Sequence, residues 1–203
     1  MDRLQTLFSS KKNNILSVYF TAGYPHKDST VDVIKTLSDN GVDMIEIGIP
    51  FSDPMADGPV IQHSSQQALA NGMSQALLFE QLKNIRTVTN IPLLFMGYVN
   101  TVLQYGFENL CKKAVEIGID GFIIPDLPLE EYCTLYKATV ERYGLKFVLL
   151  ITPETSEERI RQIDAASSGF VYMVSSAATT GAQQSFDQSK QERKGKRINC
   201  SLF

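Results

Sequence analysis

The sequence lacks the features that mark secreted, metal-binding and membrane-spanning proteins. It has three cysteines, an odd number, and none of them is in CxxC spacing, which argues against both a disulfide framework and a zinc site. No apolar run reaches the roughly 18 residues that a membrane span needs. The opening segment, residues 1–14, has no signal-peptide core. We therefore expect a cytoplasmic protein.

The sequence also has no large excess of positive or negative charge. The 203 residues carry 22 acidic and 19 basic side chains, for a formal net charge of −3. Such a balance predicts no binding to nucleic acid and none to an anionic membrane. With 43% hydrophobic and 20% charged residues, the chain has the composition of one globular domain with a sizeable core.

What the sequence does contain is a series of apolar runs about seven residues long. Gly, Pro, Asn or Asp bounds each run, and several runs are rich in Val, Ile, Phe and Tyr, which is typical of strands. Their hydrophobicity is nearly continuous, which favours strands covered on both faces, as in a parallel sheet. The predicted strands are residues 16–23, 43–49, 91–98, 120–126, 146–153 and 169–176.

Helical patterns separate these runs. Ser74 is predicted to cap one helix, and Thr155 another, because Glu158 follows it in capping-box spacing. Alternating strands and helices predict six βα units with right-handed crossovers. Two architectures fit this count, an open doubly wound sheet and an eight-unit barrel, although no G-x-G-x-x-G follows the first strand.

Glu46 favours the barrel. Side chains alternate along a strand, so Ile45, Ile47 and Ile49 share one face, which suits packing against helices. Glu46 and Gly48 lie on the other face, which must therefore meet something polar or spacious. The mouth of a barrel interior, at the carboxyl ends of its strands, provides such surroundings.

A carboxylate inside an apolar strand is costly unless it is paired or protonated. Desolvation should raise the pKa of Glu46, which suits a group that gives and takes a proton near neutral pH. The alternative is an ion pair with a buried cation. No Lys or Arg lies between Lys35 and Lys83, so a local partner is missing while a distant one remains open.

Three aspartates have both a chemical and a structural interpretation. Asp53, in FSDP, and Asp57, in MADGP, occupy positions that also suit simple turns. Asp126 ends the fourth predicted strand, on the active side of a barrel, but it also suits the cap of a helix that begins near Leu129.

Two further features have simple structural interpretations. His26 and His63 have no serine or carboxylate companion at suggestive spacing, and we interpret both as solvated side chains. The small-residue segment 175–185 is compatible with a lid or with a plain connection.

Five motifs in order along the chain resemble the tryptophan synthase alpha chain family. They are YFTAGYP (19–25), IEIGIPFSDPMADGPVIQ (45–62), PLLFMGYVN (92–100), GFIIPDLPLEE (121–131) and FVYMVSSAATTGA (170–182). The second motif is highly specific. The resemblance implies an α/β fold of the (β/α)8 TIM-barrel type, with residues 1–190 forming an incomplete barrel domain of about six βα units that lacks the last two strands.

The resemblance also implies an activity. Family members cleave indole-3-glycerol phosphate to indole and glyceraldehyde 3-phosphate by a retro-aldol lyase reaction in tryptophan biosynthesis. Glu46 matches the catalytic general acid/base, and Asp57 matches the catalytic aspartate that holds the indole N–H. The other positions matched to substrate contacts are Phe20, Thr21, Asp126, Tyr172, Thr180 and Gly181.

A partner follows from the same resemblance. Family members join a beta subunit in an α2β2 heterotetramer, and only the beta subunit carries pyridoxal phosphate. The alpha chain itself is expected to need no cofactor and no metal. The positions matched to partner contacts are Pro50, Asp53, Tyr98 and Asn100.

The tail departs from the family pattern. Residues 191–203, ERKGKRINCSLF after Gln191, are basic and show little helical amphipathicity, where two further strands with glycine-rich phosphate-binding loops are expected. This departure predicts a truncation or a change of reading frame. One alternative is a catalytically impaired fragment that only binds the beta subunit. Another phosphate-substrate barrel, an isomerase or aldolase, is disfavoured by the acids at 46 and 57 and by the lack of a strand-end lysine.

Overall fold

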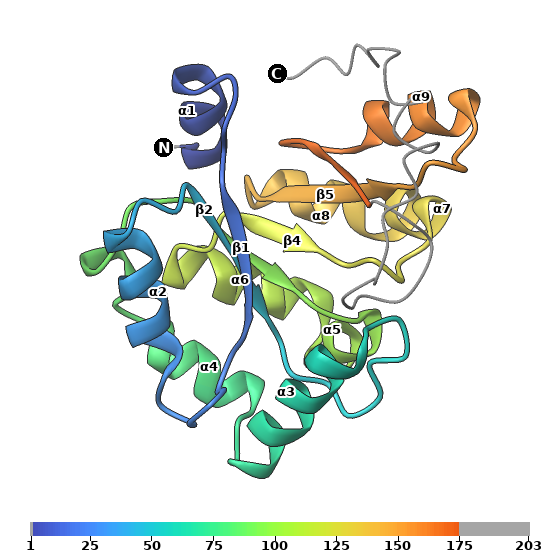
Figure 1. The fold of residues 1–203 in the computed structure, drawn as a ribbon. Coiled ribbons are helices and arrows are strands. Elements are labelled where there is room, and N and C mark those ends of the chain that lie inside the picture. The colour runs from blue at the N-terminus through green and yellow to red at the C-terminus, as the bar shows by residue number, and fades with distance from the viewer. Residues whose placement is uncertain (1, 175–203) are drawn as a thin grey trace, which may run out of the picture.

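Six parallel strands form one curled sheet in the computed structural model, which describes residues 2–174 (Figure 1). Neighbours in the sheet are neighbours in the sequence, with the order β1-β2-β3-β4-β5-β6. The strands are β1 (Ser17–Thr21), β2 (Met44–Gly48), β3 (Leu93–Met96), β4 (Gly121–Ile123), β5 (Lys146–Ile151) and β6 (Val171–Met173). Each lies within the segment that the sequence predicts for it.

One helix precedes β1, and the others follow the strands in turn. The helices are α1 (Arg3–Ser10), α2 (Thr30–Asp39), α3 (Pro59–Ala70), α4 (Gln75–Leu82), α5 (Val99–Tyr105), α6 (Phe107–Ile117), α7 (Leu129–Glu131), α8 (Lys137–Arg142) and α9 (Glu157–Ala166). Two short elements complete the set, the 3₁₀ helix η1 (Ile85–Thr87) and the π-helix η2 (Tyr132–Tyr136), which joins α7 to α8.

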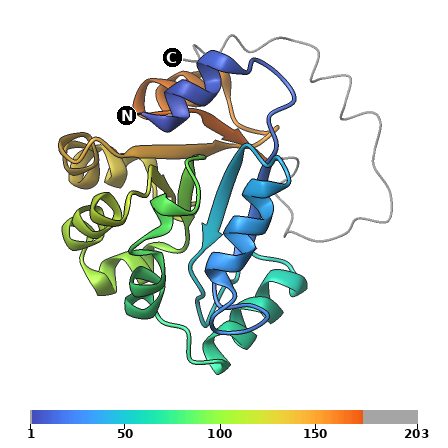
Figure 2. The same ribbon diagram turned by 90° about the vertical axis from the view of Figure 1, so that its left-hand side faces the viewer.

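The sheet order decides between the two predicted architectures. A doubly wound sheet reverses its strand order at a switch point and carries helices on both faces. Here the order never reverses, and the crossover helices lie along the outer face of the curled sheet (Figure 2). The described residues therefore form the α/β barrel type, with β1 and β6 at the two edges.

Helix starts follow the predicted capping chemistry with one correction. The Ser74 side chain accepts from the Leu77 N–H, as predicted. The cap of α9 lies one residue later than predicted. Ser156, not Thr155, caps the helix by accepting from the Arg159 N–H. The Thr155 hydroxyl instead accepts from the Thr152 N–H over 2.8 Å, which closes the turn that precedes α9.

The two faces of the sheet pack into separate apolar clusters. Ile45 and Ile47 belong to the large cluster between the sheet and the outer helices. Met44, one residue earlier, belongs to a smaller inner cluster to which α1 contributes Leu4. The Phe8 ring of α1 also packs against Phe170 at the inner face, with 5.6 Å between ring centroids. The amino-terminal helix therefore closes one end of the curled sheet.

A partly buried ion-pair cluster supports that end. Asp120 accepts from Arg3 Nη1 over 2.9 Å and from Arg86 Nη2 over 2.6 Å. Its Oδ2 atom also accepts from the Leu93 N–H at the start of β3. One carboxylate thus joins α1, η1 and two neighbouring strands.

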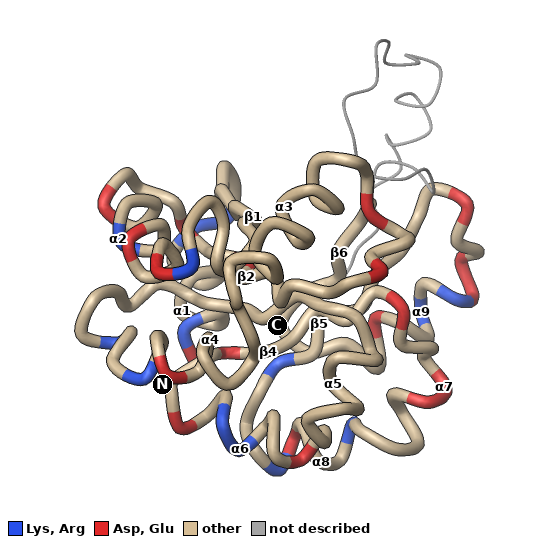
Figure 3. The backbone as a smooth tube through the Cα atoms, turned by 90° about the horizontal axis from the view of Figure 1, so that it is seen from below, with Lys and Arg blue, Asp and Glu red and all other residues tan. Residues whose placement is uncertain are grey.

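Away from this cluster, several helices carry charges of both signs (Figure 3). In the view of Figure 3, Lys and Arg alternate with Asp and Glu around α2, α6 and α8 instead of gathering by sign. Within residues 2–174, no helix combines the length and apolar character that crossing a bilayer requires.

Candidate functional site

A cavity of about 340 Å³ opens on the inner face of the sheet, between the β1–β2 pair and β6. Residues from three strands and the loop before β6 line it. They are Ser17, Tyr19, Met44, Glu46, Phe170, Val171, Tyr172 and Met173. Glu46 is the carboxylate among them, so the acid singled out in the sequence faces this cavity.

Glu46 is almost completely buried, with 2% of its surface exposed. Its Oε1 atom accepts a hydrogen bond from the Ser17 hydroxyl over 2.6 Å. Burial raises the pKa of Glu46 above its ordinary value, and the Ser17 bond opposes that rise. No ion pair within residues 2–174 includes Glu46, so the cation of the alternative interpretation is not found there.

Tyr19 lies beside Glu46 and was missed by the sequence analysis. The two residues pair across the β1–β2 ladder, so both side chains point to the inner face. The Tyr19 ring lies over Gly48, where a Cβ atom would come within 2.7 Å of the ring carbon Cε2. Burial raises the pKa of the Tyr19 hydroxyl, and the charges of Asp57 and Glu46 add to the effect.

Asp57 lies on the loop that joins β2 to α3. Its Oδ2 atom accepts from the Tyr98 hydroxyl over 2.9 Å, and its backbone carbonyl accepts from the Gln62 side-chain amide. The Tyr98 hydroxyl also accepts from the Ala56 N–H. Burial, followed by the bond to Asp57, raises the pKa of Tyr98 far above its ordinary value. Asp57 is therefore held in place by the loop after β3.

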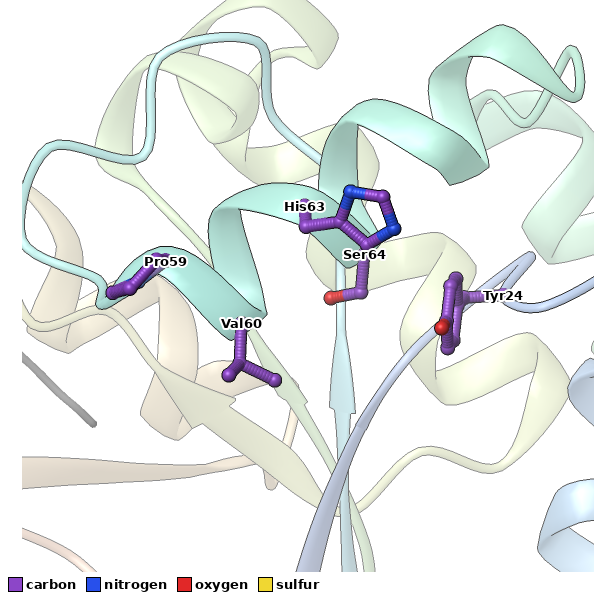
Figure 4. A pocket seen from close by; sticks show the side chains of 5 residues that line it. All are labelled: Tyr24, Pro59, Val60, His63 and Ser64. Atoms are coloured by element: carbon purple, nitrogen blue, oxygen red, sulfur yellow. The ribbon is translucent and has the colours of Figure 1, made fainter. Parts of the chain in front are cut away.

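A second cavity, of about 320 Å³, lies beside the start of α3 (Figure 4). Tyr24, Pro59, Val60, His63 and Ser64 line it. The Tyr24 and His63 rings meet edge to face, with 6.4 Å between their centroids. His63 is exposed, as predicted. This cavity contains no carboxylate and is separate from the Glu46 site.

No metal site accompanies these residues. Among residues 2–174, no group of three or more His, Cys, Asp and Glu side chains is arranged to hold an ion.

Comparison with known proteins identifies the family. Residues 4–196 match the family model described as tryptophan synthase alpha chain. The chain belongs to the tryptophan synthase alpha chain family. The alpha chain of Bacteroides thetaiotaomicron is 63% identical over 190 residues, which cover 94% of this chain and 74% of that relative. The alpha chain of Flavobacterium psychrophilum is 61% identical over 188 residues, covering 92% and 74%.

Solved structures agree. The tryptophan synthase of Mycobacterium tuberculosis superposes with a TM-score of 0.84 at 30% identity, covering 95% of this chain and 75% of that one. The tryptophan synthase alpha subunit of Legionella pneumophila superposes with a TM-score of 0.82 at 36% identity, covering 89% and 70%. The six described strands are therefore part of a TIM barrel of the kind found in the family.

The family-matched substrate positions are not all brought together. Tyr172 lines the Glu46 cavity, and burial and the Glu46 charge raise the pKa of its hydroxyl. Thr21 is buried at the end of β1, with its hydroxyl 2.7 Å from that of Ser64, a residue of the second cavity. Thr180 and Gly181 lie outside the described residues.

Phe20 requires a correction. It packs against the cluster on the helix side of the sheet, on the face opposite to Glu46. The predicted position beside the substrate therefore does not suit Phe20. Tyr19, its neighbour in β1, lines the cavity instead.

Asp126 also differs from its alternative interpretation. It does not cap the helix at Leu129, because Pro128 precedes that helix without a side-chain bond. Its Oδ1 atom instead accepts from the Val99 N–H, the first residue of α5, over 2.9 Å. Asp126 is exposed and connects the loop after β4 to the loop after β3.

The four positions matched to partner contacts differ in exposure. Asp53 and Asn100 are exposed and accessible to a partner. Pro50 is buried and offers little surface of its own. Tyr98 is half-buried because its ring packs against Phe51, with 5.2 Å between centroids, and its hydroxyl is bonded to Asp57.

Proposed function

We propose that this chain is a carbon–carbon lyase of tryptophan biosynthesis that cleaves indole-3-glycerol phosphate to indole and glyceraldehyde 3-phosphate. Membership of the tryptophan synthase alpha chain family supports the reaction class. The observation that carries the proposal is Glu46, a buried carboxyl with a raised pKa that faces a cavity. A buried carboxyl with a raised pKa that faces a cavity is suited to give a proton to a substrate and to take one back.

The chemistry needs a proton in one place and a proton acceptor in another. Indole leaves only after its C3 atom gains a proton, and the adjacent glycerol hydroxyl must lose one as the carbon–carbon bond breaks. Glu46 carries out both transfers by cycling one proton. Asp57 binds the indole N–H and stabilises the cation that forms on the ring. Tyr172 lies beside the bound substrate.

The reaction uses acid–base groups alone, so this chain supplies no cofactor and no metal. The partner is a tryptophan synthase beta subunit, which would carry pyridoxal phosphate and receive the indole in an α2β2 assembly. Asp53 and Asn100 provide exposed contacts for it. We place the protein and its reaction in the cytoplasm.

The experiment measures indole release from indole-3-glycerol phosphate, with and without a beta subunit. The unaltered chain is compared with Glu46→Gln and Asp57→Asn, and Asp32→Asn, at an exposed aspartate of α2, serves as the charge-matched control. We expect indole from the unaltered chain and from Asp32→Asn, and a loss of at least about a hundredfold in the two site variants. Equal rates in all four proteins, or no indole from the unaltered chain, would refute the proposal.

A further inference from the structure

Ser17 is placed to control Glu46. It is the first residue of β1, two positions before Tyr19, so both side chains point to the inner face of the sheet. Tyr19 pairs directly with Glu46, and Ser17 pairs with Met44, so Ser17 reaches Glu46 along the diagonal of the ladder. The 2.6 Å bond to Oε1 is a short one, as expected of a hydroxyl that donates to a carboxylate.

The other side chains around Glu46 give it no comparable donor. On the inner face, β3 presents the apolar Leu94, the loop before β6 presents Phe170, and β6 presents Tyr172. The titratable neighbours are Tyr19 on β1 and Tyr172 on β6, whose pKa values are both raised by burial and by Glu46, so both are neutral near pH 7. Within the described residues, the Ser17 bond is thus the interaction that favours the ionised form of Glu46.

We propose that Ser17 is a positioning residue that holds Oε1 of Glu46, so that Oε2 is the oxygen that exchanges the proton with the substrate. The inference rests on the proposed function. An O–H group that donates to Oε1 in both protonation states leaves only Oε2 for the mobile proton. The hydroxyl also fixes the rotamer of a carboxyl for which the described residues supply no cation, and it opposes the rise in the Glu46 pKa that burial causes.

One oxygen, Oε2 of Glu46, both gives and takes back the proton during the reaction. Protonated Oε2 gives its proton to C3 of the indole ring, which forms a C–H bond and leaves Glu46 as a carboxylate. The same oxygen then takes the proton of the glycerol hydroxyl. The C=O bond of the aldehyde forms, the bond to C3 breaks, and its electron pair returns to the ring. Glu46 ends protonated, as it began, and no other reactant is needed.

The test changes the hydroxyl and keeps the shape. Ser17→Thr retains the O–H group. Ser17→Val has the shape of threonine but no O–H group. Ser17→Ala removes the O–H group and adds no methyl group. Threonine and valine both favour strands, so the pair separates the hydroxyl from packing. The full chain is labelled with ¹³C at the glutamate carboxyl carbon, and Glu46→Gln assigns the Glu46 signal in a pH titration followed by NMR.

We expect the Glu46 pKa to rise by about one pH unit or more in Ser17→Val and Ser17→Ala, because each loses a hydrogen bond to a charged group. In Ser17→Thr it should stay within about half a unit of the unaltered chain. The pH profile of kcat for indole release should move in the same direction as the NMR titration, and Ser17→Thr should restore it.

The two readouts separate the inference from the proposed function. An unshifted Glu46 pKa in Ser17→Val overturns the inference whatever the rates are. A shifted pKa together with a complete lack of indole release by the unaltered chain overturns the proposed function, while the control of Glu46 by the Ser17 hydroxyl stands. A pKa shift of equal size in Ser17→Thr also overturns the inference, because it assigns the effect to packing.

Discussion

The Tyr98 hydroxyl donates a hydrogen bond to Asp57 Oδ2 over 2.9 Å, which joins the loop after β3 to the loop after β2. The same hydroxyl accepts from the Ala56 N–H, and the Tyr98 ring packs against Phe51. A position matched to partner contact therefore also holds the proposed catalytic aspartate. Any partner that moves Tyr98 changes the position of the Asp57 carboxylate.

Removing that hydroxyl should impair the reaction without unfolding the chain. In Tyr98→Phe, Asp57 loses a charge-assisted hydrogen bond of about 1.5–3 kcal/mol. We expect indole release to fall by roughly tenfold or more, since 1.36 kcal/mol corresponds to tenfold in rate. Steady-state indole release at neutral pH is the measurement, with thermal unfolding as the check on stability.

Tyr105→Phe is the matched control, because it removes a hydroxyl from the other end of α5. The Tyr105 ring packs edge to face against Phe79, within the helix layer and away from Asp57. The control should keep the unaltered rate. An equal loss in both variants would show that α5 as a whole, and not the bond to Asp57, controls the rate.

Glu46→Gln should stabilise the fold in a pH-dependent way. Burial raises the folded-state pKa of Glu46 above its ordinary value of 4.5. Well below pH 4.5 the glutamate is neutral in both folded and unfolded chains, so the substitution changes little. As the pH rises from there through the folded pKa, the folded glutamate must ionise while buried, and its contribution to stability is lost. Glutamine cannot ionise, so the variant escapes this loss.

The measurement is urea unfolding of Glu46→Gln and the unaltered chain from pH 4 to pH 8. The difference in unfolding free energy should be small at pH 4, grow with pH and then level off. Glu130→Gln, at an exposed glutamate, controls for the loss of one negative charge. A gain of the same size and pH dependence in Glu130→Gln would assign the effect to net charge instead of burial.

The sequence was sufficient to predict the positions of the strands and the face of the sheet on which Glu46 lies. Near-continuous apolar runs bounded by Gly, Pro, Asn and Asp mark all six strands, and the two-residue period of 45–49 places the glutamate opposite the isoleucines. The same two-residue period shows that the predicted position of Phe20 beside the substrate is inconsistent with that of Thr21. Phe20 and Thr21 are neighbours in one strand, so their side chains point to opposite faces and cannot both line one pocket.

The long-range contacts could not be predicted in this way. Tyr98 and Asp57 are 41 positions apart, and Arg86 and Asp120 are 34 apart. The Tyr98–Asp57 pair meets because neighbouring parallel strands end side by side, and the Arg86–Asp120 pair meets because they also begin side by side, at the opposite end of the sheet. Charge or hydroxyl content alone does not select which side chain of a neighbouring loop becomes the partner. The capping-box spacing between Thr155 and Glu158 favoured the wrong cap, since Ser156 also carries the required hydroxyl and caps the helix.

Asp120→Ala should destabilise the end of the sheet that α1 covers. The Asp120 side chain is 8% exposed and accepts from both Arg3 and Arg86, so its removal leaves two guanidinium groups without their carboxylate. We expect a loss of about 3 kcal/mol in unfolding free energy, because breaking a buried ion pair leaves an uncompensated charge. Glu157→Ala, which breaks the exposed pair with Arg161, should cost about 0.5 kcal/mol or less.

Urea unfolding at pH 7 compares the two variants directly. If Asp120→Ala cost no more than Glu157→Ala, the cluster at Asp120 would contribute no more than a surface ion pair. In that case the position of α1 would depend on its apolar contacts alone.

Gly48 should tolerate no side chain while Tyr19 is present. A Cβ atom at Gly48 would overlap the Tyr19 hydroxyl and lie 2.7 Å from Cε2 of the ring. Gly48→Ala should therefore displace the ring and cost about 1–3 kcal/mol, the range for overpacking a core. Gly97→Ala is the control, since its nearest neighbour would be Ile49 Cβ at 3.3 Å, a contact that a small shift relieves.

A double-mutant cycle identifies the cause. Because ring carbons as well as the hydroxyl crowd the site, Tyr19→Phe should not rescue Gly48→Ala, whereas Tyr19→Ala should. The unfolding free energies of Tyr19→Ala, Gly48→Ala and the double variant should therefore be non-additive by about 1 kcal/mol or more. Additive costs would mean that the Tyr19 ring does not set the requirement for glycine at position 48, and that another neighbour on the inner face does.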